Sequence, residues 1–273
     1  AVKIPLFPVH TWLPAAHVEA PTAGSVVLAA VLLKLGTYGL VRFALQMTPD
    51  AFRAAALPVA ILAVFSALYG AFVALAQTDL KRLVAYTSVN HMGYVVLGVA
   101  VAAAAADATA SRVALDGAVL QMVSHGVVTG ALFLLVGVIQ DRAHTREMTA
   151  FGGLLRRTPA IGWMFVLAAF ASLGLPGLAH FPAEFQVFLG AFGVWPLLTA
   201  IVVVGIAVTA GLYLRAIQAT FLGPLPERWS SMPDITPREA WAVVPLLLLT
   251  VAIGVAPGWL LATIDRAAAV IGR

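Results

Sequence analysis

Cysteine is absent from this chain of 273 residues, and charged residues are scarce. Without cysteine, neither a disulfide framework nor a cysteine-ligated metal or iron–sulfur site is available, so any redox chemistry must belong to a partner. Asp, Glu, Lys and Arg make up only 10% of the residues, against about a quarter in soluble globular proteins. Hydrophobic residues make up 62%, and the mean hydropathy is +0.98. The composition therefore predicts a polytopic membrane protein.

Several other signals are missing. The sequence contains no glycine-rich phosphate loop and no arrangement of nucleophile and base typical of a hydrolase. The net charge of +4 is spread over short connections, and such scattering does not favour nucleic-acid binding. The first residues contain no initiator Met, charged leader or small-residue cleavage site, so they do not resemble a signal peptide. We expect the sequence to begin inside a longer protein.

Apolar segments long enough to cross a bilayer, which takes about 20 residues each, recur along the chain. The connections between them are too short for a soluble domain. Residues 1–273 are therefore predicted to form a single membrane domain, an all-α bundle of transmembrane helices. Residues 159–192 form an interrupted span, and residues 1–14 are expected to be the second half of an earlier interrupted helix. The uninterrupted spans are predicted at about 22–43, 57–78, 82–106, 115–139, 195–222 and 240–264.

Lys and Arg are distributed unevenly over the connections. Loops 79–82, 140–158 and 223–239 fall on one predicted side of the membrane, and cytoplasmic loops carry an excess of basic residues. We therefore expect these loops in the cytoplasm and the C-terminus on the outer face. The eight basic residues of this side are Lys81, Arg82, Arg142, Arg146, Arg156, Arg157, Arg228 and Arg238. The opposite side has five, Arg42, Arg53, Arg112, Arg266 and Arg273.

Lys34 lies near the middle of the apolar segment SVVLAAVLLKLGTYGLVRF, too deep to reach the membrane surface easily. A charge at mid-span costs about 2.5–3.5 kcal/mol on insertion scales, and such residues normally mark a water-filled path or a partner. We predict that Lys34 carries protons. The alternative is a snorkelling or lipid-facing lysine.

Two histidines each lie within a polar stripe of an apolar span. The stripes follow the helical spacing of three and four residues. A single histidine of this kind is readily explained as a neutral imidazole that is hydrogen-bonded between helices. Two of them together with Lys34 favour a proton relay, because histidine titrates nearest to neutral pH. The stripes contain Thr87, Ser88, His91 and Tyr94 in one span and Gln121, His125 and Thr129 in the other.

Glu184 follows a break in the apolar run ASLGLPGLAHFPAEFQVFLGAF. Prolines remove backbone donors and open a helix, and non-helical backbone at membrane depth is tolerated only where protein or a cavity covers it. A functional carboxylate is expected at such a place. The break contains Gly174, Pro176, Gly177 and Pro182.

Lys3 precedes Pro5 and Pro8 in KIPLFPVHTWLP, and this lysine too is expected beside a broken helix. Half-helix ends and freed carbonyls can stabilise a charge that a regular helix cannot. The chain thus has two predicted breaks, one with Lys and one with Glu. Paired breaks suggest an internal repeat of the transporter type.

The remaining histidines are less informative. His10 and His17 are expected at the membrane edge, His144 in a loop, and His180 within the second break. Their spacing matches no metal-ligand pattern on a helix, and we expect no metal site in this chain.

Four segments together resemble a known family. They are KIPLFPVHTWLPAAHVEAPTAGSVVLAAVLLKLGTYGLVRF, QTDLKRLVAYTSVNHMGYVVLG, LQMVSHGVVTGALFLLVGVIQDRAHTR and LGLPG with AEFQVFLGAF. They resemble the antiporter-like subunit M of bacterial NADH:quinone oxidoreductase, respiratory complex I, the counterpart of mitochondrial subunit 4. The resemblance runs from residue 1 to about 222 and more loosely to the end. Mrp-type antiporters and membrane-bound hydrogenases share the lysines, whereas Glu at the second break and the HTR loop favour subunit M.

The resemblance implies a role for five residues in a central hydrophilic axis that protons cross. Lys3 resembles the lysine of the broken seventh helix and Lys34 that of the eighth. His91 and His125 resemble the histidines of the tenth and eleventh helices, and Glu184 the glutamate of the broken twelfth. The fold implied is part of an inverted-repeat antiporter fold.

The resemblance also implies partners and a location. No cofactor is expected in this chain, and quinone, FMN and iron–sulfur clusters are expected in partner subunits. The partners would be the other membrane and peripheral subunits of the complex and the lipid bilayer, with no nucleic acid, in the bacterial inner membrane. Alternatives are a subunit of a Mrp-type cation/proton antiporter or of a membrane-bound hydrogenase, or a purely structural fragment.

The sequence departs from the family pattern in two ways. The usual Asn-Phe-Val-Gly-Glu-Phe at the second break reads His180-Phe181-Pro182-Ala183-Glu184-Phe185, which is expected to change hydration or to add a titrating group. The first six helices of the family have no counterpart, including the glutamate that would pair with Lys3. We therefore expect an N-terminally truncated fragment of the subunit.

Overall fold

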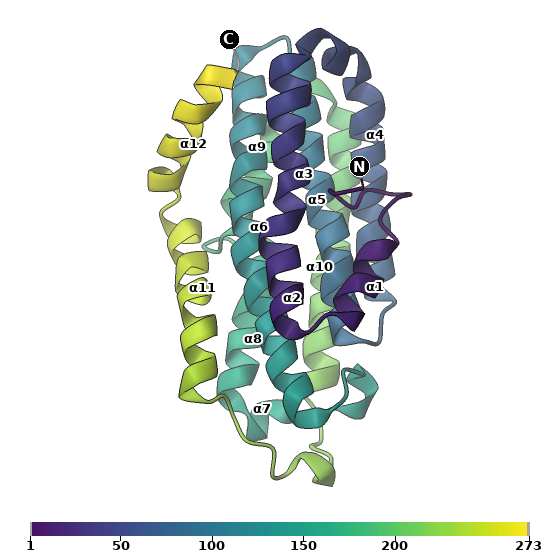
Figure 1. Ribbon diagram of the computed structural model, residues 1–273, viewed down its shortest axis with the longest axis vertical. Coiled ribbons are helices and arrows are strands. Elements are labelled where there is room, and N and C mark those ends of the chain that lie inside the picture. The colour runs from purple at the N-terminus through teal and green to yellow at the C-terminus, as the bar shows by residue number, and fades with distance from the viewer. Residues whose placement is uncertain (1, 272–273) are drawn as a thin grey trace.

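The apolar segments of the sequence fold into helices that run roughly along one long axis (Figure 1). The structure is a computed structural model and describes residues 2–271. No strand occurs within that range, where extended pairing is limited to an isolated bridge between Asp79 and Glu147. The predicted all-α class is therefore confirmed.

Six helices of the described chain are long and apolar enough to cross a membrane. The first is continuous through α2 (Thr22–Val27), η1 (Leu28–Leu32), α3 (Leu33–Gly39) and η2 (Leu40–Leu45). The others are α4 (Pro49–Leu75), α5 (Leu80–Ala104), α6 (Ala108–Ala143), α10 (Pro196–Phe221) and α11 (Pro237–Val255). Each corresponds to one of the predicted uninterrupted spans.

Several helices begin or end beyond the predicted limits because polar caps extend them past the apolar run. The Asp79 side chain accepts from the backbone N–H groups of Lys81 and Arg82 at the start of α5. Asp107 accepts from Ala110 N at 2.9 Å at the start of α6. A side-chain acceptor satisfies N–H groups that have no partner within the helix. Hydropathy alone therefore placed these starts too late.

The interrupted span at 159–192 is confirmed. It consists of α8 (Pro159–Ser172) and α9 (His180–Val194), joined by a non-helical segment. Gly174 and Gly177 adopt positive φ angles of 81° and 90° in this segment. Glycine has no Cβ and reaches this region of backbone conformation without steric cost. The sequence of the break thus directly explains its geometry.

Two predicted elements are wrong in detail. Residues 2–11 form turns instead of a half-helix, and the helix α1 (Trp12–Glu19) begins only after them. Pro5 and Pro8 remove backbone donors and so prevent a regular helix there. The expected span 240–264 is also divided, because α11 ends at Val255 and α12 (Gly258–Ile271) follows Pro257. The residue before a proline is disfavoured in the helical region, and Ala256 accordingly has φ −135°.

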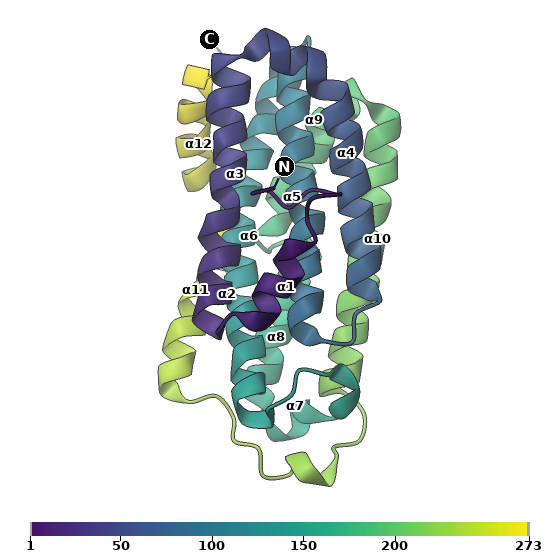
Figure 2. The ribbon, with the colours of Figure 1, turned by 45° about the vertical axis from the view of Figure 1, so that its right-hand side comes forward.

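Helix α5 occupies the centre of the bundle and is buried along nearly its whole length. Figures 1 and 2 show α4, α6 and α10 around it, with α1 and α3 on one side. Small residues allow the backbones to approach closely, as is typical of membrane helix pairs. A Cβ at Gly93 of α5 would lie 2.8 Å from the Ala63 carbonyl oxygen of α4. A Cβ at Gly117 of α6 would lie 2.6 Å from Val187 N of α9.

The three basic loops lie together at one end of the bundle, the lower end in Figure 2. Leu80 N donates to the Arg146 carbonyl at 3.0 Å, and Gly153 N donates to the Leu222 carbonyl at 2.8 Å. Arg146 also forms an ion pair with Asp79 at 3.1 Å. The predicted alternation of the loops is therefore correct. The cytoplasmic side of this end stays a prediction.

We expect Gly117→Ala to lower the stability of the bundle by about 1–3 kcal/mol, the usual cost of overpacking. The added methyl group would meet backbone atoms of α9, which cannot rotate away. Unfolding of the purified chain by sodium dodecyl sulfate in bicelles, followed by circular dichroism, measures this difference. Gly211→Ala is the matched control, because no atom lies within 4 Å of a Cβ at this helical position. Equal stability of the two variants would contradict the packing described here.

Candidate functional site

The break between α8 and α9 places a carboxylate in the interior of the bundle. Glu184 lies in α9, shortly after the break, and is only 4% exposed. A Cβ at Gly174 would lie 2.8 Å from Glu184 Oε2, so the glycine leaves space for the carboxylate. Gln121 of α6 donates from Nε2 to Glu184 Oε1 at 3.2 Å. The carboxylate is therefore held between the break and α6.

His91 of α5 connects this carboxylate to the centre of the bundle. Its Nδ1 lies 3.2 Å from Glu184 Oε1. Its Nε2 lies 3.1 Å from the hydroxyl oxygen of Ser172, the last residue of α8. Both ring nitrogens lie near polar atoms, but only Nε2 has a hydrogen-bond partner among the described residues, so the ring is held from the Ser172 side.

A further histidine comes from the break itself. His180 is the first residue of α9, and its Nδ1 lies 3.7 Å from Glu184 Oε1 and 3.2 Å from the Ser172 carbonyl oxygen. The His91 and His180 ring centroids are 4.5 Å apart. Residues at i and i+4 share a helix face, which brings His180 and Glu184 together toward α5.

His125 of α6 extends the group to the lysine. Lys34 Nζ lies 2.6 Å from His125 Nδ1 and donates to the Ala29 carbonyl at 2.5 Å. The His125 ring centroid lies 5.7 Å from that of His91 and 6.2 Å from that of His180. Lys34, His125, His91, His180 and Glu184 thus form one group, which we call the axis cluster.

The backbone around Lys34 is irregular. Lys34 lies in α3, between the π-helical segments η1 and η2. The wider π turn is rare and occurs frequently at functional sites. The carbonyl that accepts from Lys34, that of Ala29, belongs to η1. Local unwinding therefore supplies a partner for a charged group that a regular apolar helix would leave without one.

A branch of hydroxyl groups leads from the axis cluster to α10. Tyr213 of α10 donates to Ser172 Oγ at 2.8 Å and lies 3.3 Å from Thr87 Oγ1 of α5. Ser172, Thr87 and Tyr213 are fully buried. Asn90, one helical turn from Thr87, donates to the Ala67 carbonyl at 2.8 Å and to the Tyr94 hydroxyl at 3.0 Å. The polar interior thus continues along α5 toward α4 and α10.

The interior also holds polar atoms that have no hydrogen-bond partner among the described residues. Some lie in or beside the axis cluster, and others belong to His10, His17, Asp116, Gln140 and Thr220. Each such group costs about 1–3 kcal/mol when it is buried. Native structures retain few of them, and they require an explanation. Those beside the axis cluster are open to a further partner such as water. They include His125 Nε2, His180 Nε2, Gln121 Oε1, Ser124 Oγ and Thr129 Oγ1.

Four of the five residues predicted from the sequence converge, namely Lys34, His91, His125 and Glu184. Lys3 does not join them. Its side chain is exposed, and its Cβ lies against Gly36 of α3 on the outside of the described bundle. Its role in proton transfer stays a prediction.

Sequence reasoning left out Ser172 and Tyr213 and gave little weight to His180. A hydroxyl in an apolar span is a weak signal, and nothing in the sequence pairs Ser172 with a residue 41 positions away. The spacing of His180 and Glu184, four residues apart, was the available signal for the histidine. His10 and His17 are also buried, but they lie outside the axis cluster. The His17 ring stacks on the Phe133 ring, with 4.4 Å between the ring centroids.

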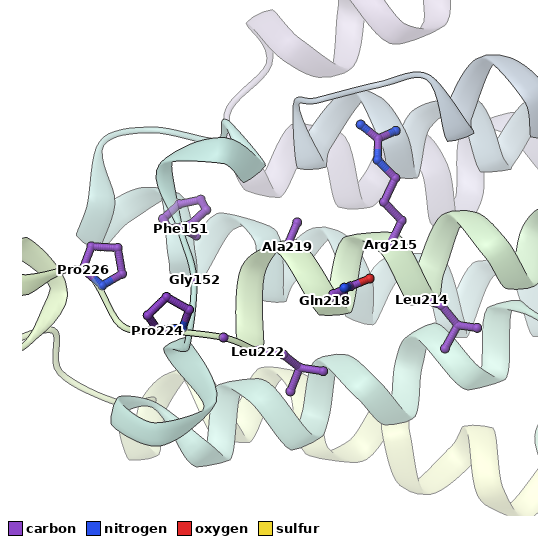
Figure 3. Close-up of a pocket in the computed structure, with 10 residues that line it drawn as sticks. Phe151, Gly152, Leu214, Arg215, Gln218, Ala219, Leu222, Pro224 and Pro226 are labelled. Atoms are coloured by element: carbon purple, nitrogen blue, oxygen red, sulfur yellow. The ribbon is translucent and has the colours of Figure 1, made fainter.

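A separate open pocket of about 850 Å³ lies at the loop end of α10 (Figure 3). Arg215 and Gln218 are the polar side chains among its lining residues, beside Phe151, Pro224 and Pro226. None of its lining residues belongs to the axis cluster. The buried cluster, and not this surface pocket, is the candidate functional site.

The family model for the transmembrane part of NADH:quinone oxidoreductase and Mrp antiporters matches residues 1–209. The chain belongs to this family. NADH-quinone oxidoreductase subunit M of Rhodobacter capsulatus is 46% identical over 258 residues, which cover 94% of this chain and 49% of the relative. The chain spans about half the length of the curated relatives it matches. The resemblance to subunit M is confirmed.

Solved structures agree with this assignment. A chain of respiratory complex I from Thermus thermophilus with bound NADH is 34% identical, with a TM-score of 0.91, and the match covers 100% of this chain and 56% of that chain. A chain of the Mrp complex from Dietzia sp. DQ12-45-1b has a TM-score of 0.89 over 100% of this chain and 57% of its own. At 21% identity the second match shows the fold alone. The antiporter-like class of the fold is confirmed.

We expect Ser172→Ala and Tyr213→Phe each to destabilise the chain by about 1–3 kcal/mol, because each leaves a buried partner unsatisfied. Their effects should not add. The coupling free energy of the double variant should be about 0.6–1.7 kcal/mol, the upper range measured for membrane hydrogen bonds. Unfolding titrations in bicelles measure all four proteins of the cycle. Thr263→Ala, which removes an exposed hydroxyl bond within α12, is the control and should change stability little. Strict additivity would show that the hydroxyl branch is not connected.

Proposed function

We propose that this chain is a proton-translocating membrane subunit of an NADH:quinone oxidoreductase, with electron transfer in other subunits driving the protons. The observation that carries the proposal is the series of the half-buried Lys34 and the buried His125, His91 and Glu184, which lie on four helices, α3, α6, α5 and α9. Family membership and the similarity to subunit M support it.

The energetics of burial favour transport over a purely structural role. Ionisable groups inside a membrane domain are costly, and they normally mark ion or proton paths. A structural hydrogen bond could be formed by neutral Asn, Ser or Thr side chains at lower cost. The chain instead places a lysine, three imidazoles and a carboxylate within one connected group.

The proposed path begins or ends at Lys34 and passes through imidazoles. The 2.6 Å contact between Lys34 Nζ and His125 Nδ1 lies within the range of direct proton transfer. His125 lies beside His91, whose Nδ1 faces the Glu184 carboxylate at 3.2 Å. Protonation of one site repels a proton on its neighbour in a medium of low dielectric constant. A proton that arrives at one site of this series therefore favours release of the proton from the neighbouring site.

The discontinuous helix supplies the other requirement of the proposal. Broken helices form ion sites in transporters, because their half-helix ends and unpaired backbone groups stabilise charge. The break between α8 and α9 contributes Ser172, His180 and Glu184 to the cluster. We place the water-accessible end of the path at this break.

The chain itself has no redox role in this proposal. Iron–sulfur clusters would be held by partner subunits, since the chain has no cysteine to ligate them. We assign quinone and FMN to partner subunits as well. The partners would be the other membrane and peripheral subunits of the respiratory complex. The membrane would be the bacterial inner membrane, with the end that carries the basic loops in the cytoplasm. Residues 1–273 would form one proton-conducting domain.

A Mrp-type cation/proton antiporter is the second candidate, and the family description includes it. Both use buried ionisable groups, so the axis cluster is compatible with either. Affinity purification of the tagged protein from its native membrane separates them. Co-purification of flavin and iron–sulfur subunits supports the oxidoreductase, and their absence from an intact complex supports the antiporter.

We expect Lys34→Ala in the assembled complex to remove most proton pumping and the coupled NADH:quinone turnover. Lys34→Arg should do the same, because a guanidinium keeps the charge but cannot release a proton in a protein. Proton uptake into proteoliposomes and NADH oxidation measure the two activities, and a native gel checks assembly. Normal pumping by a correctly assembled Lys34→Arg variant would overturn the relay role of this residue.

We expect Glu184→Gln to impair pumping strongly and Glu184→Asp to retain part of the pumping. The position must gain and lose a proton, and movement of one charge across 100 mV is worth about 2.3 kcal/mol. Gln keeps the shape of the side chain but cannot take up or release a proton. Asp keeps a titrating carboxylate on a side chain that is one methylene shorter. The same proteoliposome assay applies, with equal amounts of assembled complex. Equal pumping by both variants would assign Glu184 a structural hydrogen-bonding role.

A further inference from the structure

His91, His180 and Glu184 bring three ligand atoms to one place in the buried centre of the bundle. Each residue offers one atom, and these atoms all lie within 4.8 Å of one another. Glu184 Oε1 lies 3.2 Å from His91 Nδ1 and 3.7 Å from His180 Nδ1. Ligand atoms of a tetrahedral site with zinc bonds of about 2.0–2.2 Å lie roughly 3.3–3.6 Å apart. The two oxygen–nitrogen spacings are close to this range. A bound ion would replace the present hydrogen bond from His180 Nδ1 to the Ser172 carbonyl, because Nδ1 must lose its proton to bind a metal.

We propose that His91, His180 and Glu184 form a binding site for a divalent transition-metal ion of the Zn²⁺ class. Two imidazoles and one carboxylate are a known ligand set of zinc, with the fourth position left to water. Mg²⁺ and Ca²⁺ prefer oxygen ligands and are poorly matched to two nitrogens. The class of ion therefore follows from the donor atoms.

The surroundings orient the ligands as metal sites require. The ring nitrogen of His91 that faces away from Glu184 contacts Ser172 Oγ at 3.1 Å, and Tyr213 donates to the same hydroxyl at 2.8 Å. Gln121 donates to the carboxylate at 3.2 Å. Such outer partners fix ring orientation and ligand geometry in metal sites. His91 and Glu184 are thus each held by a hydrogen bond from a residue that is not itself a ligand.

The glycine at the break leaves room beside the carboxylate. Gly174 faces Glu184 Oε2, where any Cβ would lie 2.8 Å from that oxygen. The three ligands are each no more than 4% exposed, so the ion would be enclosed by protein. The carboxylate offsets one of the two positive charges of such an ion, and the imidazole nitrogens replace water in its coordination shell.

This inference departs from the expectation that the chain has no metal site. That expectation rested on histidine spacing within single helices. The ligands instead come from two helices, with His91 on α5 and the pair His180 and Glu184 four residues apart on α9. His180 is the decisive residue, because it adds the third ligand atom to the contact between His91 and Glu184.

The metal site shares His91 and Glu184 with the proposed relay. A metal ion and a proton compete for the same lone pairs, so Zn²⁺ at this site blocks proton transfer. The inhibition rests on the proposed function, whereas the binding does not. The two can therefore be tested separately.

The binding test uses the full chain in lipid nanodiscs, stripped with a chelator and then dialysed against micromolar ZnCl₂. Inductively coupled plasma mass spectrometry measures the number of zinc ions bound per chain, and circular dichroism checks the fold. We expect one tightly bound ion in the unmodified chain and its loss in His180→Asn. His144→Asn is the matched control, because it removes an exposed histidine in a left-handed conformation that Asn tolerates. Equal zinc content in the chain with His180→Asn would overturn the site.

Glu184→Gln gives a second test if the His180→Asn variant fails to fold, because Gln has a shape similar to that of Glu but no carboxylate. Loss of the ion in this variant supports the site, and retention overturns it. Co²⁺ in place of zinc reports the ligand geometry. A visible absorption band of tetrahedral Co²⁺ that disappears in either variant supports the assignment, and a purely six-coordinate spectrum contradicts it.

The inhibition test measures proton uptake by the assembled complex in proteoliposomes during titration with ZnCl₂. We expect half-inhibition at a zinc concentration at least about tenfold lower than in the His180→Asn complex, since loss of even an outer partner costs 10–100-fold in affinity. Each complex is compared with its own zinc-free rate. Zinc that binds at one ion per chain without slowing proton uptake would support the site and contradict the relay through His91 and Glu184. Inhibition that is independent of His180 would contradict the metal site and leave the relay intact.

Discussion

The contact between Glu184 on α9 and His91 on α5 is the interaction on which the interior of this bundle depends. A carboxylate in an apolar interior is tolerated only with close polar partners, and the fold supplies them from α5, α6 and the break before α9. The break brings Ser172 and His180 to the same place. The central helix α5 is consequently polar in its middle although it is buried along nearly its whole length.

Close packing of small residues makes that polar interior possible. Gly93 and Gly117 allow α4, α5, α6 and α9 to approach at backbone distance, so short side-chain contacts form between helices that are far apart in sequence. Lys34 reaches His125 from a helix whose backbone is widened into π turns on both sides. Packing and chemistry are therefore coupled, since a shift of one helix would separate the members of the axis cluster.

The same geometry has two chemical consequences. Imidazole and carboxylate groups that exchange protons easily are also the groups that bind transition-metal ions. In our proposals His91 and Glu184 take part in both, and His180 adds the third ligand. A proton path built from such groups is open to block by a metal ion wherever three of them converge.

The sequence by itself determined the class of the fold, the positions of the spans and most of the candidate residues. Hydropathy is a local property, so it located six spans and the interruption before Glu184. It failed at Pro257 and in residues 2–11, where a local backbone restriction overrides apolar composition. Only the tertiary structure decided which residues meet. The 2.6 Å contact of Lys34 with His125 joins residues 91 positions apart, and the contact of Ser172 with His91 joins residues 81 apart. Such pairings depend on helix register and crossing, which are set by packing between helices and leave no periodic signal within one of them.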